Sequence, residues 1–210
     1  MKKIIFVLLL ASSFLISARS YADETNNNNE IRGELGDGKD SNKSVSSWAF
    51  SLSSLQWNET LVLRQPGKSD TDVANFSGLA LGLQKEITYY HWGWNIGGFF
   101  GSGRANGGGN STSIPYVQSR QSFSIFGLTP RAFYRLSGRI NVGVSALAYL
   151  RNIDWPAANA GTTVEASKNF TVTALADLNL RISNSFEFYQ GIGPLSDSGT
   201  FWKIGLNYRF

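Results

Sequence analysis

The chain has 210 residues and no cysteine. Charged residues make up only 16%, aromatic residues 13%, and the formal net charge is +4. The lack of cysteine excludes a disulfide scaffold and a lipid-modified cysteine, and the charge forms no basic stripe of the kind that binds nucleic acid. With 22 glycines, this composition is typical of an all-β protein with little charged surface.

The first 22 residues have the pattern of a secretory signal peptide. Lys2 and Lys3 precede an apolar run over 4–16, and the small residues Ser20 and Ala22 predict cleavage after Ala22. The alternative is a membrane-anchoring helix, but the run is shorter than the roughly 20 residues that a span needs. Residues 23–44 are polar, rich in asparagine and carry a net negative charge, so we expect a disordered periplasmic tail there. The remaining residues, 45–210, are expected to form a β-barrel.

Eight segments alternate apolar with polar or small residues, which predicts β-strands. They cover 46–64, 73–84, 88–100, 122–136, 140–151, 169–182, 186–192 and 202–210, with a bulge or bend expected at Pro130. Long connections follow the first, third, fifth and seventh segments (65–72, 101–118, 154–167 and 193–199). Three-residue turns follow the others, at 85–87, 137–139 and 183–185. A soluble sandwich has no reason to place all its long loops at one end. The pattern predicts an all-β, eight-stranded antiparallel up-and-down transmembrane β-barrel.

The last strand carries a recognisable pattern. Lys203, Gly205, Tyr208 and Phe210 match the closing-strand signal read by the outer-membrane barrel assembly machinery, and residues 45–210 resemble the small eight-stranded outer-membrane barrels of the OmpA/OmpX type. The resemblance lies in the architecture and the closing signal, not in a family-specific motif. It implies a Gram-negative outer membrane, periplasmic termini, extracellular long loops and a monomer. It also implies contact with outer-membrane lipid and lipopolysaccharide, and with the assembly machinery during biogenesis.

The polar faces of the strands are expected to line the lumen, with the apolar faces in lipid. A soluble exported barrel, with its apolar face inside, is the alternative. The predicted lumen charge network consists of Arg131, Arg135, Arg151, Asp177, Arg181, Glu187, Lys203 and Arg209, with His91 nearby. These are six bases against two acids, so a narrow anion-preferring channel is an alternative function. The acidic tail could also supply the missing negative charge.

No catalytic site is predicted. Outer-membrane lipid-modifying enzymes resemble one another in needing a histidine beside a serine or an acid, and the one histidine, His91, is expected in the lumen near the periplasmic end. No cluster has metal-ligand spacing, and we expect no cofactor. Arg104, Tyr116, Arg120 and Trp155 are the candidate contact residues in the long loops. The predicted function is a structural or surface-interaction role through these loops. The alternatives are a porin-like pore and, less favoured, a lipid-modifying enzyme.

Overall fold

The computed structural model describes residues 44–108, 112–166, 169–195 and 199–210. The predicted signal peptide and all of the predicted tail except Ser44 lie outside these residues. The strands are β1 (Val45–Gln65), β2 (Lys68–Thr88), β3 (Trp92–Gly107), β4 (Gln121–Leu128), β5 (Arg131–Arg135), β6 (Ile140–Ile153), β7 (Thr163–Ala166), β8 (Phe170–Arg181), β9 (Phe186–Pro194) and β10 (Thr200–Arg209). No helix within the described ranges is long and apolar enough to cross a membrane.

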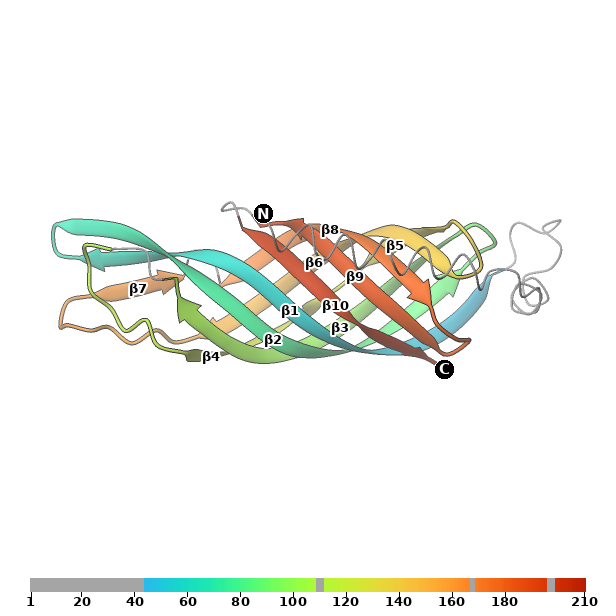
Figure 1. The fold of residues 1–210 in the computed structure, drawn as a ribbon, viewed down its shortest axis with the longest axis horizontal. Helices are drawn as coiled ribbons and strands as arrows, with labels where there is room; N and C mark the ends of the chain where they lie inside the picture. Colours follow the sequence, from blue (N-terminus) through green and yellow to red (C-terminus); the bar gives the residue numbers. More distant parts are fainter. Residues whose placement is uncertain (1–43, 109–111, 167–168, 196–198) are drawn as a thin grey trace. The chain divides into compact units, whose positions relative to one another are not determined.

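The strands close into a ring of eight. Each strand pairs antiparallel with its neighbours, β4 and β5 together occupy one position, and β10 returns to pair with β1 (Figure 1). The closing contact runs from Ala49, opposite Arg209, to Gln56, opposite Trp202. The predicted eight-stranded antiparallel barrel is confirmed.

The pairing register fixes the geometry of the ring. Following hydrogen-bonded partners around the barrel gives the path Ser46, Ile87, Trp94, Ala132, Val144, Ala176, Ile192, Trp202 and Gln56. The path returns to β1 ten residues above its start, since Ser46 becomes Gln56. For strand spacings of about 4.8 Å and rises of about 3.3 Å, this stagger gives a tilt of about 40° and roughly 16 Å between opposite backbones.

The first long loop is absent, and that prediction was wrong. β1 and β2 each run for 21 residues and are joined by a two-residue turn at Pro66 and Gly67, where Gly67 has φ of 77°. Residues 68–72 are the first residues of β2, where Lys68, Ser69 and Thr71 are exposed and Asp72 is buried. The turn expected at 85–87 lies instead at 89–91, which leaves Glu86 inside β2.

The predicted bulge at Pro130 is also absent. Leu128 pairs with Gly98 and Arg131 pairs with Asn95, so the register is the same on both sides of the proline and no residue is inserted. The Pro130 carbonyl still accepts a hydrogen bond from the Ala146 amide at 2.9 Å. Proline removes one donor and separates β4 from β5 without shifting the ladder.

The polarity of β1 reverses along its length. Near the C-terminal end of the barrel, Phe50 and Leu52 are exposed on the outside while Ser51 and Ser53 are buried inside. Beyond Ser54 the inward row becomes Leu55, Trp57, Glu59, Leu61 and Leu63, and the outward row begins with the exposed Gln56 and Asn58. β2 follows the same rule, with Leu79, Leu81 and Leu83 outside at one end and Ala74 and Phe76 inside at the other. We call the part near the short turns and the C-terminus the lower part, and the part toward the turn between β1 and β2 the upper part. The lower part of the barrel is therefore apolar outside, and the upper part is apolar inside.

The upper part, made of the β1–β2 hairpin beyond Gln56 and the strand β7, forms a folded extension. Gln56 is the last residue of β1 that pairs with β10. Further along, β1 pairs instead with the short β7, from Leu61 opposite Ala166 to Arg64 opposite Thr163. Figure 1 shows β1, β2 and β7 continuing beyond the ends of β8, β9 and β10. Because β7 covers part of an edge that β10 no longer covers, the protruding hairpin is a three-stranded sheet there. The predicted loop 154–167 thus contains a strand.

Candidate functional site

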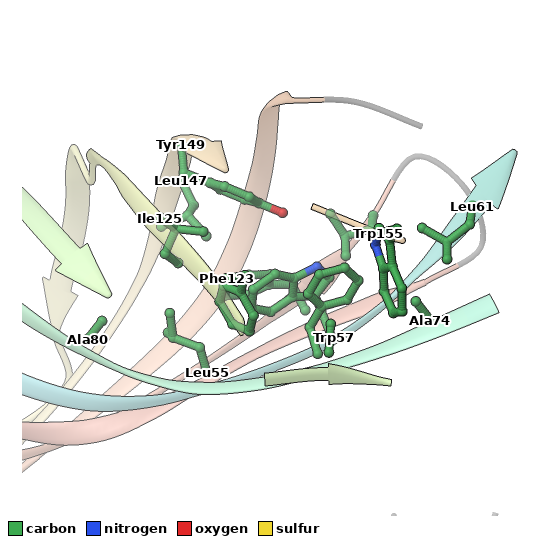
Figure 2. Close-up of a cluster of buried hydrophobic side chains, with 14 of the residues drawn as sticks. Leu55, Trp57, Leu61, Ala74, Ala80, Phe123, Ile125, Leu147, Tyr149 and Trp155 are labelled. Carbon is green, nitrogen blue, oxygen red and sulfur yellow. The ribbon is translucent and has the colours of Figure 1, made fainter. Parts of the chain in front are cut away.

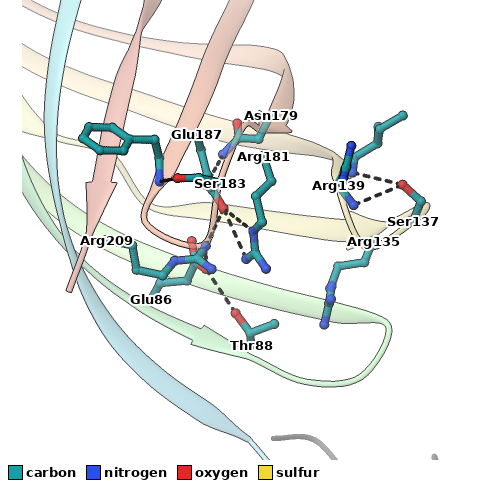
Figure 3. A network of polar contacts seen from close by, with 12 residues as sticks. Glu86, Thr88, Arg135, Ser137, Arg139, Asn179, Arg181, Ser183, Glu187 and Arg209 are labelled. Carbon is teal, nitrogen blue, oxygen red and sulfur yellow. Dashed lines mark hydrogen bonds and ion pairs between the residues drawn. The ribbon is translucent and has the colours of Figure 1, made fainter. Parts of the chain in front are cut away.

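The interior divides into three layers, and the lowest is a charge cluster near the short turns. Arg209 Nη2 lies 2.6 Å from Glu86 Oε1 and 2.7 Å from Glu187 Oε1, while Arg181 Nη2 lies 3.3 Å from the same Glu187 oxygen (Figure 3). The structure therefore brings together Arg181, Glu187 and Arg209, as expected. Arg135 lies beside this cluster and donates to the Tyr90 carbonyl at 3.5 Å.

The middle layer is built around Asp177. Arg131 Nε donates to Asp177 Oδ1 at 2.7 Å, and Ser145 Oγ donates to Asp177 Oδ2 at 2.8 Å. Lys203 Nζ lies 5.1 Å from the Tyr189 ring centroid and 5.7 Å from that of Phe99. All of these side chains except Phe99 are polar, so this layer is a hydrogen-bonded interior of the kind that a barrel in lipid requires.

The upper layer is an aromatic and aliphatic plug. Trp57 stacks on Phe76 at 4.8 Å between centroids and on Phe201 at 5.3 Å, and its edge meets Phe123 at 5.2 Å (Figure 2). Other members of the plug are at most 1% exposed: Leu55, Ile125, Leu147, Tyr149, Leu175 and Phe201. These rings and branched chains fill the cross-section of a barrel only roughly 16 Å wide between backbones.

Glycines on β2 and β3 make room for this plug. A Cβ atom on Gly103 would lie 2.7 Å from the Phe123 ring, and one on Gly101 would lie 3.1 Å from Ile125. Both glycines stand on the inner face of β3, where larger side chains would displace the residues of β4. The glycines of β3 thus leave room for the large side chains of the neighbouring strand β4, where Phe123 pairs with Gly103 and Ile125 with Gly101.

A buried ion pair sits at the top of the plug. The Arg151 guanidinium contacts the Glu59 carboxylate, and both side chains are at least nine-tenths buried. Trp57 Nε1 donates to Glu59 Oε2 at 3.4 Å, and the Arg151 guanidinium lies 5.0 Å from the Phe76 centroid. Of the two arginines in the predicted network that Asp177 could reach, Arg131 pairs with it, and Arg151 pairs with Glu59 instead.

The interior contains more acidic side chains than the sequence predicts. Glu59, Asp72 and Glu86 are all buried and point inward, in addition to Asp177 and Glu187. Five acids now face the six bases of the predicted network, so the surplus falls from +4 to +1 among the described residues. A surplus of this size no longer calls for the acidic tail or for an anion pathway. The parity of β1 and β2 contained this signal: Glu59 is in step with Trp57 and Leu61.

His91 is not in the lumen, so that prediction was wrong. It lies in the exposed turn after β2, and this turn begins four residues later than expected. The His91 ring contacts Tyr90, at 4.5 Å between centroids, and Tyr134, at 6.1 Å. The described part of the chain also contains no group of three histidine, cysteine or acidic residues that could hold a metal ion.

Two of the four candidate contact residues are core residues. Tyr116 and Trp155 are each only 7% exposed and meet edge to face at 6.0 Å, so their prediction as surface contacts was wrong. Aromatic residues in a long loop were read as exposed, but here they close the extension from above with Ile114 and Leu195. Arg104 and Arg120 are exposed.

Two aspartates attach the loop after β3 to the β1–β2 hairpin. Asp70 Oδ2 accepts from the Ser113 amide at 2.7 Å, and Asp72 accepts from the Tyr116 hydroxyl. The Ser113 and Thr71 amides lower the pKa of Asp70, while burial and the Asp72 carboxylate raise the pKa of Tyr116. The extension is therefore a hydrogen-bonded unit in which this loop is fixed.

The four residues of the predicted assembly signal have distinct places in β10. Lys203 points into the lumen, and Tyr208 and Phe210 are exposed on the outside with their rings 6.2 Å apart. The Phe210 amide donates to the Trp48 carbonyl at 2.9 Å, and the Trp48 amide donates back at 3.1 Å. A Cβ on Gly205 would lie 2.8 Å from the Ser53 Cα, so the seam requires glycine there for close approach of the strands.

No protein-family model and no curated protein matches the sequence. Several solved structures are similar. One is Ail, the attachment invasion locus protein of Yersinia pestis, with 17% identity and a TM-score of 0.45 over 77% of this chain and 99% of Ail. Another is Neisserial surface protein A, with 9% identity and a TM-score of 0.37 over 79% of this chain and 97% of that protein. An outer membrane channel from Pseudomonas putida F1 has 8% identity and a TM-score of 0.34 over 84% of this chain and 100% of the channel.

The buried Arg151–Glu59 pair provides a stability prediction. Glu59→Gln removes the carboxylate that faces a buried guanidinium, so the free energy of unfolding should fall by about 3 kcal/mol. Glu165→Gln is the matched control, because its ion pair with Arg64 is more than half exposed and should be worth about 0–1 kcal/mol. Urea unfolding in lipid vesicles, followed by tryptophan fluorescence, measures both. Equal losses in the two variants would contradict a structural role for the buried pair.

Proposed function

We propose that this chain is an integral outer-membrane barrel that passes no solute and catalyses no reaction, and that it serves as a structural and surface-interaction protein through its extension. The observation that carries the proposal is the reversal of polarity along β1 and β2. An apolar exterior with a polar interior suits hydrocarbon, and a polar exterior with an apolar interior suits water. The short turns and both ends of the barrel sequence then face the periplasm, and the extension faces the outside.

The filled lumen supports a role without transport. A channel needs a continuous polar path, but the plug around Trp57 and Phe201 separates the polar middle layer from the extension. Enzymatic function has little support from the site, because the one histidine lies in an exposed turn beside Tyr90 and Tyr134. The rigid extension, tied together by Asp70, Asp72 and β7, offers a preformed surface for a partner.

Conductance tests this reading against the pore alternative. The refolded protein should give no single-channel steps in a planar bilayer, because closely packed apolar side chains block the lumen. Heat-modifiable gel migration of the same preparation provides the control that the barrel has folded. Reproducible anion-selective steps from folded protein would contradict the proposal and favour the porin-like alternative.

Arg104 and Arg120 suggest the lipid partner of the outer surface. Arg104 pairs across the ladder with Ser77 and Ser122, and the exposed Arg120 lies two residues before Ser122, just outside β4. The exposed Phe100 and Phe126, which pair with each other, lie four residues further down β3 and β4, about 13 Å along the strands. Two guanidiniums at that height above the apolar band are placed for the phosphates of lipopolysaccharide, which arginine binds in a bidentate manner.

Replacing both arginines tests this contact. The double variant Arg104→Gln and Arg120→Gln should bind lipopolysaccharide at least tenfold more weakly, since each charge-assisted hydrogen bond is worth about 1.5–3 kcal/mol. Lys68→Gln, at the tip of the hairpin, is the control and should leave the affinity unchanged. Binding is measured with vesicles containing intact or dephosphorylated lipopolysaccharide. Equal affinity of the double variant and the native protein would refute the contact.

A further inference from the structure

A small polar cavity lies in the middle layer of the barrel. It has a volume of about 20 Å³, and all nine residues that line it are polar, among them Arg131, Ser145, Tyr189, Lys203 and Asn207. A water molecule needs about 10–15 Å³ of such space, so the cavity has room for at least one group of that size. None of the nine residues is acidic.

The cavity is rich in donors that the described protein groups leave unused. Arg131 Nη1 is buried and has no hydrogen-bond partner in the described residues. Lys203 is only 8% exposed and lies beside the rings of Phe99 and Tyr189, with no carboxylate within ion-pair distance among the described residues. A buried ammonium without an acceptor is costly, so these donors require an occupant that accepts hydrogen bonds.

Asp177 does not supply that acceptor to Lys203. Its Oδ1 oxygen is taken by Arg131 and its Oδ2 oxygen by Ser145. The middle layer thus holds two cations, Arg131 and Lys203, against one carboxylate. The plug lies above this layer, and the lower cluster, in which Arg209 and Arg181 are 17% and 12% exposed, lies below it. The surplus positive charge is enclosed between the two.

We propose that this cavity is a binding site for a monatomic anion, chloride under physiological conditions, held by Lys203 Nζ and Arg131 Nη1. One negative charge neutralises the layer, which water does not do. The anion enters from the periplasmic mouth, past the guanidiniums of Arg135, Arg181 and Arg209. It stabilises the closed barrel and does not cross it.

The test follows the stability of the full chain, refolded into detergent micelles so that the assembly machinery plays no part. Sodium chloride replaces sodium gluconate at constant ionic strength, and urea unfolding is measured at each composition. The folding constant should rise with chloride and, above the dissociation constant, increase tenfold for each tenfold rise in chloride. Lys203→Met keeps a similar volume without the charge and should abolish this dependence. Lys68→Met, which removes an exposed charge at the hairpin tip, should retain it.

The outcomes separate a halide site from a water-filled cavity. A native protein that shows no chloride dependence overturns the proposal, and so does a dependence that persists in Lys203→Met. If Lys203→Met does not refold, bromide-soaked crystals of the native protein decide the question. An anomalous peak between Lys203 Nζ and Arg131 Nη1 supports the site, and its absence at saturating bromide overturns it.

Discussion

The hydrogen bonds between β10 and β1 are the interaction on which the rest of the structure depends. An open sheet edge cannot persist in hydrocarbon, because nothing there satisfies backbone donors and acceptors. Closure with a stagger of ten residues, from Ser46 to Gln56, sets the tilt and the width of the barrel. Phe210, bonded to Trp48, completes the seam at its lower end, and Gly205 permits the close approach of the two strands.

The width of the ring then determines what the interior contains. Such a narrow barrel is filled by its own side chains, and the two solvents outside it decide which kind. Beside hydrocarbon, the outward row is apolar and the inward row takes the polar residues, including Asp177 and Glu187. Beyond Ser54 the outward row takes the polar Gln56 and Asn58, and the inward row takes Leu55, Trp57 and Leu61 and becomes an ordinary hydrophobic core. Plug and extension are one continuous core in this sense.

Period-two alternation predicted the strand number, the connectivity and the closing pair, because alternation depends on a local pattern that every strand repeats. It failed where polarity reversed: residues 68–72 resembled a loop because polar residues occupy both sides of the strand, Ser69 and Thr71 outside and Asp70 and Asp72 inside. Glu59 and Glu86 were missed for related reasons, since one lies in the reversal zone and the other was assigned to a turn. Tyr116 and Trp155 could not be placed from sequence, because their burial depends on a loop folding back onto a hairpin 44 residues away.

The central claim is that one strand, β1, passes from lipid to water near Ser54. Because the chain contains no cysteine, single-cysteine variants at Leu52, Asn58 and Trp57 report three distinct environments without background labelling. In intact cells, a membrane-impermeant maleimide should label Asn58→Cys and neither of the others. A fluorophore placed at Leu52→Cys in vesicles should be quenched by lipids brominated in their acyl chains, and one at Asn58→Cys should not. Equal lipid quenching at both positions, or labelling of Leu52→Cys from outside the cell, would contradict the account.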